Sequence, residues 1–169
     1  GRNTARFYDP AMQAAAEARA VLEKDMRRGL AMREFVLHYQ VQVDGEGTPV
    51  GAEALVRWQH ATRGLVSPGE FILLAEQTGM ILELGQWVME AACMQLAAWA
   101  HDPVMAHWTL AVNVSASQFG HPDFVAHVFS ALQRSGARAD RLKLELTESM
   151  LAVDIEDIIF KMFAIKSRG

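Results

Sequence analysis

Segments with the pattern of a β-strand alternate with segments with the pattern of an amphipathic helix, and this alternation restricts the fold to the α/β class. The turn at 44–47 is too short for a parallel crossover, so the first two strands should form an antiparallel hairpin, whereas the later strands, separated by helices, should be parallel. The expected strands are 35–43, 50–58, 108–115 and 141–147. The expected helices are 10–29, 67–79, 84–101, 122–135 and 154–169.

The order of these segments also predicts that the sequence is part of a larger sheet. The series stops after a helix, where a further strand should pair, and we expect the sequence to be about the first half of a larger α/β barrel. The free edge of the last strand should then expose apolar surface.

Two of the expected helices carry further local signals. Ser67 and Glu70 are expected to form a capping box. The last helix is expected to have the apolar stripe Ile155, Ile158, Ile159, Met162 and Ile165.

Three of the expected strands carry an oxygen-bearing side chain between aliphatic or small residues: Glu53, Asn113 and Glu145. Strand alternation puts these side chains on the face opposite the aliphatic ones. In a barrel whose helices cover the aliphatic faces, they would point inward near the strand ends, where barrels hold their active sites. Oxygen ligands suit hard divalent cations such as magnesium or manganese. The pattern therefore predicts a metal site on one face of the sheet.

A solvated strand face is the other interpretation of these residues. A single glutamate on a strand is more often a surface group than a ligand. Strands joined by helical crossovers, however, usually have both faces covered. Two carboxylates that point inward would repel each other unless a cation lies between them. The metal site therefore remains the favoured hypothesis.

Composition argues against several classes of function. The net charge of −4 gives no basic surface for a nucleic-acid polymer, and no apolar run is long enough to span a bilayer, so we expect no membrane contact by this segment. The single cysteine, Cys93, is expected to be a small buried hydrophobe. None of the six histidines has the spacing of a zinc-binding helix motif.

The motifs, taken in order, resemble EAL domains, bacterial phosphodiesterases that act on cyclic di-GMP. The signature is Glu-Ala-Leu-Val-Arg-Trp at 53–58, preceded by Tyr39 and Gln40. The motifs that follow it lie at 67–72, 75–79, 112–115 and 144–149. The similarity covers about residues 30–169. The opening residues 1–7 resemble the end of a GGDEF domain, so residues 1–29 are expected to be a linker helix between a GGDEF-like domain and the first portion of an EAL domain.

The resemblance implies a TIM-barrel-like (β/α)8 fold with an antiparallel first strand, and a role for each matching residue. Glu53, Asn113 and Glu145 match the family's ligands for Mg²⁺ or Mn²⁺. Glu148 matches a glutamate that steadies a catalytic loop, so Glu53 and Glu148 are the expected catalytic residues. The expected substrate contacts are Gln40, Leu55 and Arg57. The family's Asp-Asp-Phe-Gly-Thr-Gly loop would follow Gly169, so this piece alone is expected to be inactive.

The implied activity is metal-dependent hydrolysis of cyclic di-GMP to linear pGpG by the parent protein. A cyclic di-GMP receptor without catalysis is the main alternative, since some members of the family have lost activity, and a purely structural role is the third. The resemblance also implies a cytoplasmic location, with any membrane anchor in other domains, and a homodimer of the full-length protein.

Overall fold

The computed structural model describes residues 10–146 and 155–168, which form a five-stranded sheet with helices packed against it. The strand order is β1-β2-β4-β5, with β3 paired to the far end of β2. The strands are β1 Phe35–Val43, β2 Pro49–His60, β3 Gly64–Val66, β4 Thr109–Val114 and β5 Leu142–Leu146. β1 and β2 form an antiparallel hairpin, and β2, β4 and β5 are parallel, which confirms the strand directions expected from the connections.

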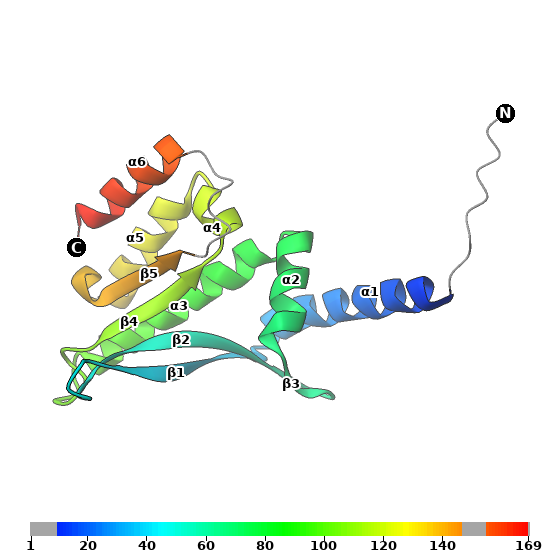
Figure 1. Cartoon of the computed structure of the whole chain (residues 1–169), viewed down its shortest axis with the longest axis horizontal. Helices are drawn as coiled ribbons and strands as arrows, with labels where there is room; N and C mark the ends of the chain where they lie inside the picture. Colours follow the sequence, from blue (N-terminus) through cyan, green and yellow to red (C-terminus); the bar gives the residue numbers. More distant parts are fainter. Residues whose placement is uncertain (1–9, 147–154, 169) are drawn as a thin grey trace.

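The helices connect the strands and cover one face of the sheet. α3 lies along β4, and α5 and α6 follow near β5, whereas α1 extends away from the sheet (Figure 1). The helices are α1 Pro10–Ala31, α2 Pro68–Thr78, α3 Ile81–Trp99, α4 Ala116–Gly120, α5 Phe124–Ser135 and α6 Ile155–Lys166, with a short 3₁₀ helix at Ala139–Arg141. None of the described helices is long and apolar enough to cross a membrane.

The hydrophobic core lies between the sheet and this helical layer. The aliphatic residues of β4, Leu110, Val112 and Val114, are fully or almost fully buried. At the other end of the sheet the Trp58 side chain, 0% exposed, stacks on Phe35 with ring centroids 5.3 Å apart and meets Phe71 edge-on at 6.0 Å. The Trp58 indole N–H donates to the Glu34 carboxylate at 3.0 Å. This hydrogen bond connects the aromatic cluster to the segment between α1 and β1.

The start of α2 differs from the sequence expectation. Ser67 precedes the helix in extended conformation, but its side chain makes no cap hydrogen bond. The Glu70 carboxylate instead accepts from Arg63 Nη2 at 3.1 Å, an ion pair with a side chain outside the helix. The capping box predicted here was therefore wrong: Arg63 holds the carboxylate that would have reached back to Ser67.

An apolar groove that is accessible to solvent lies between β5 and α6. Leu142, Leu144 and Leu146 line a groove of about 530 Å³ together with α6. Ile155, Ile159 and Met162 of the expected α6 stripe are exposed, as are Phe160 and Phe163, whereas Ile158 and Ile165 pack against the core. The predicted stripe is thus only partly buried, because α6 turns part of it toward the groove.

Cys93 is buried in α3, which fits its expected role as a small core residue. Burial, with a smaller effect of the Glu90 charge, raises the pKa of its thiol from 9.0 to about 11. The unfolded chain therefore loses this proton at lower pH than the folded chain, so the contribution to stability is complete below pH 9 and falls as the pH rises toward 11. Urea unfolding at about pH 8 and about pH 10.5 should show a larger loss of stability for the unsubstituted protein than for Cys93→Ala. Equal losses would contradict this assignment.

Candidate metal and substrate site

Glu53 lies on β2 and faces away from the helical layer. Its neighbours Ala52 and Ala54 are buried against that layer, so strand alternation puts the half-buried Glu53 carboxylate on the other face. β2 continues to His60, so Glu53 lies inside its own strand and not near the strand end that the sequence suggested. The parallel register with β4 covers only Gly51 to Ala54, so Glu53 is the next-to-last residue of the paired segment.

Asn113 is the next-to-last residue of β4 and contacts Glu53 directly. Its Nδ2 donates to Glu53 Oε1 at 2.6 Å, a side-chain bond between neighbouring parallel strands. The aliphatic neighbours Val112 and Val114 face the core, which fixes Asn113 on the Glu53 side of the sheet. The bond is accessible to solvent, so a small ion could reach both side chains.

Glu145 is the next-to-last residue of β5 and lies opposite Asn113 in the parallel register. Its neighbours Leu144 and Leu146 pack against the core, so the half-buried Glu145 side chain shares the face of Asn113. Adjacent strands lie about 4.8 Å apart. The topology therefore brings all three predicted ligands to one face of β2, β4 and β5.

Two carboxylates and one amide oxygen are a ligand set that fits Mg²⁺ or Mn²⁺, which prefer oxygen and keep several waters. Among residues 10–146 and 155–168, no three His, Cys, Asp or Glu side chains gather as a metal cage. A cation here would therefore depend on the Asn113 amide and on further ligands such as water.

The expected substrate contacts lie beside these residues. Gln40 is exposed on β1 and is the register partner of Glu53. Leu55 and Arg57 follow Glu53 on the same face of β2, and both line a pocket of about 220 Å³ that also includes Asn113 and Glu76. Arg57 Nη1 donates to the Val56 carbonyl at 2.9 Å. Glu148, the other expected catalytic residue, lies outside the described residues.

The turn after Asn113 is held by a capping box that the sequence analysis missed. Ser115 begins the short helix α4: its Oγ accepts from the Gln118 backbone N–H at 3.2 Å, and its own N–H donates to Gln118 Oε1 at 3.2 Å. Both residues are buried. The signal was present as Ser-x-x-Gln directly after a strand.

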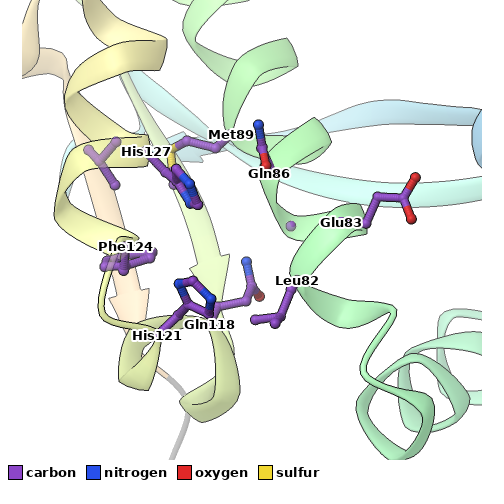
Figure 2. A pocket seen from close by; sticks show the side chains of 10 residues that line it. Leu82, Glu83, Gln86, Met89, Gln118, His121, Phe124 and His127 are labelled. Atoms are coloured by element: carbon purple, nitrogen blue, oxygen red, sulfur yellow. The ribbon is translucent and has the colours of Figure 1, made fainter.

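Gln118 also packs against α3. Figure 2 shows its side chain extending from α4 toward α3, at a pocket of about 300 Å³ that is also lined by His121, directly after α4, and by His127 of α5. A Cβ atom at Gly85 of α3 would collide with the Gln118 amide. A glycine at position 85 is therefore what lets the cap of α4 lie directly on α3.

Gly85→Ala should destabilise the protein by about 1–3 kcal/mol, because the buried Gln118 amide must move away from the added methyl group and give up its bond to the Ser115 N–H. The matched control is Gly69→Ala in α2, where the nearest atom to the added methyl group is Ser67 Oγ at 3.8 Å. The control should be neutral or stabilising, because alanine favours helix more than glycine does. Urea unfolding of both variants tests the difference, and equal stability of the two would refute the close contact.

The sequence is similar to that of known proteins. A model of the EAL domain family matches residues 23–169. The chain is 43% identical over 170 residues to the bifunctional diguanylate cyclase/cyclic di-GMP phosphodiesterase MucR of Pseudomonas aeruginosa, and 38% identical over 170 residues to the cyclic di-GMP phosphodiesterase NbdA of the same bacterium. These alignments include 100% of this chain but 25% of MucR and 22% of NbdA, so the chain spans about a quarter of the curated relatives that it matches.

Solved structures give the same relationship. The PaMucR phosphodiesterase in complex with c-di-GMP superposes with a TM-score of 0.82 at 40% identity, covering 88% of this chain and 60% of that chain. The EAL enzyme Bd1971 with bound cAMP and cyclic di-GMP has a TM-score of 0.82 at 28% identity, covering 92% and 43%. The sheet and helices described above are thus part of the TIM-barrel-like α/β fold of these proteins. With residues 23–169 matched by the family model, the chain belongs to the EAL domain family.

Proposed function

We propose that this chain is the portion of a cyclic di-GMP phosphodiesterase that holds a catalytic divalent cation, Mg²⁺ or Mn²⁺, and that the parent protein hydrolyses cyclic di-GMP to linear pGpG. The observation that carries the proposal is the Asn113–Glu53 hydrogen bond of 2.6 Å, with Glu145 opposite Asn113 on the next strand. The names of MucR and NbdA, both cyclic di-GMP phosphodiesterases, support the same activity.

Each of the three side chains would coordinate the cation. Glu53 and Glu145 supply negative charge, and Asn113 would turn its amide so that Oδ1, not Nδ2, faces the ion, because an N–H group cannot act as a ligand. A bound divalent cation supplies a water of lowered pKa and stabilises charge that develops on phosphate oxygens. Glu148, as the expected support of a catalytic loop, belongs to the same proposal.

The neighbouring residues fit a cyclic dinucleotide. Arg57 has a planar guanidinium that can bind a phosphate through two parallel hydrogen bonds. Leu55 offers an apolar contact for a base, and Gln40 lies beside Glu53 with both donor and acceptor groups. The pocket beside Asn113 thus has charged, polar and apolar walls, as small-molecule sites usually do.

The proposal extends to the organisation of the parent protein. We infer that residues 1–29 link a GGDEF-like domain to the first portion of the EAL domain at 30–169; residues 1–9 of this linker lie outside the described residues, and α1 begins at Pro10. The way α1 extends from the sheet supports a linker role (Figure 1). A homodimer in the cytoplasm remains part of the proposal, and sedimentation of the full-length protein tests the dimer.

Incubation of the full-length protein with cyclic di-GMP tests the function. With Mg²⁺ or Mn²⁺ we expect pGpG as the product, measured by chromatography, and no product after chelation of the metal. Tight binding of cyclic di-GMP without product would establish the receptor alternative and refute catalysis. Neither binding nor product would refute both and leave a structural role.

A further inference from the structure

Lys161 is the charged side chain that α6 buries, with 5% of its surface exposed. Its ammonium donates to the carbonyl oxygens of Phe119 at 2.9 Å and His121 at 3.2 Å. Its ion pair with Asp157 Oδ2, one turn earlier on α6, is 2.7 Å long. A lysine ammonium has three donors, and these partners match them one for one. Buried lysines without such partners are very rare.

The two carbonyls belong to the C-terminal end of α4. The last carbonyls of a helix lack partners within the helix and carry its partial negative charge, so a cation is favourable there. The N-terminal end of the same helix is closed by Ser115 and Gln118. Side chains therefore hold both ends of α4: Ser115 and Gln118 at the N-terminal end, and Lys161, from a helix distant in the sequence, at the C-terminal end.

The opposite end of α4 leads directly into the proposed metal site. Asn113 lies two residues before Ser115, at the end of β4. α6 also packs beside β5, whose other face carries Glu145. A shift of α6 relative to α4 would therefore move the turn that holds Asn113 with respect to Glu53 and Glu145.

We propose that Lys161 is a positioning residue for the metal site: its ammonium fixes α4, and through α4 it holds Asn113 in register with the two carboxylates. This proposal rests on the proposed function. Loss of the ammonium takes this donor from the Phe119 and His121 carbonyls and the ion-pair partner from Asp157, and it therefore also lowers stability. A positioning role must therefore be separated from this loss of stability, which the variants below do.

Three variants of the full-length protein separate positioning from stability. Lys161→Met keeps the volume and removes the donors, and Lys161→Arg restores donors to both carbonyls. Ile158→Ala removes an apolar contact between α6 and the core without touching α4's carbonyls. The readouts are the dissociation constant for Mn²⁺ alone, measured calorimetrically, and hydrogen exchange of the backbone amides at 115–121.

Lys161→Met should weaken Mn²⁺ binding by about 10-fold, as loss of groups that orient metal ligands does elsewhere, and should speed exchange at 115–121. Lys161→Arg should recover most of the affinity. Ile158→Ala should lower the melting temperature and leave the Mn²⁺ affinity unchanged. Unchanged Mn²⁺ binding by Lys161→Met, or equal weakening by Ile158→Ala, would overturn the positioning role alone. Absence of Mn²⁺ binding by the unsubstituted protein would overturn the proposed function and the positioning role together.

Discussion

Glu53→Gln should reduce the turnover of cyclic di-GMP by the full-length protein by about 10²–10³-fold, the usual loss when one charge-stabilising contact is removed from an active site. Glutamine keeps the size of the side chain and an oxygen that can accept from Asn113, so the sheet should keep its geometry. The change removes the negative charge that would hold the cation. Steady-state kinetics with a fixed Mg²⁺ concentration measures the effect, which should fall mainly on kcat.

Glu46→Gln is the matched control, since Glu46 is an exposed carboxylate in the turn of the same hairpin. It should leave turnover within about twofold, because surface substitutions of this kind are usually small. Raising the Mn²⁺ concentration should recover part of the activity lost by Glu53→Gln, because the loss comes from weaker metal binding. A Glu53→Gln protein as active as the control would contradict a ligand role for this carboxylate.

Trp58→Ala should destabilise the protein by about 3–5 kcal/mol, the range for large aromatic side chains removed from cores. The indole is fully buried between Phe35 and Phe71 and also meets the ring of His60 edge-on at 5.1 Å. For a chain of this size the loss corresponds to a fall in melting temperature of roughly 6–20 °C. Thermal unfolding followed by circular dichroism measures it.

Trp58→Phe separates packing from hydrogen bonding in this cluster. Phenylalanine keeps an aromatic ring against Phe35 but removes the N–H that donates to Glu34. This variant should therefore lose less stability than Trp58→Ala, with part of the loss, about 1 kcal/mol, due to the hydrogen bond. If Trp58→Ala unfolded at the temperature of the unsubstituted protein, the described core would be wrong.

The main elements were predictable because their signals are local. The expected strand at 35–43 coincides with β1, and the short turn after it sets the antiparallel direction of β2. The other strands and the long helices lie within a few residues of their expected bounds, since apolar periodicity and turn residues are read from neighbouring positions. Parallel pairing of β4 and β5 followed from the helices between the strands.

The missed elements are short or depend on distant partners. β3 and α4 are too brief for their periodicity to be recognised, although Ser115 and Gln118 gave a cap signal. The periodicity of α6 identified an apolar stripe but not the burial of Lys161, because the carbonyls that accept from Lys161 lie 40 and 42 residues away. Such burial follows from the packing of α6 on α4, which no local pattern encodes.

The site was predictable to the level of a shared face. Alternation put Glu53, Asn113 and Glu145 on the face opposite the aliphatic residues, and that arrangement is what the register shows. The register offset could not be read from the sequence: Glu53 pairs with Ala111 and reaches Asn113 only through its side chain. The metal-binding and substrate-binding roles of these residues stay predictions, and the ligand set must be tested with the ion itself.

The most direct test is a crystal structure of the full-length protein grown with Mn²⁺, with anomalous diffraction used to locate the metal. We predict an anomalous peak on the face of β2, β4 and β5 that carries the three side chains, within about 2.0–2.6 Å of a Glu53 oxygen, Asn113 Oδ1 and a Glu145 oxygen. A peak at a different place, or no peak beside these side chains at saturating Mn²⁺, would contradict the proposed metal site.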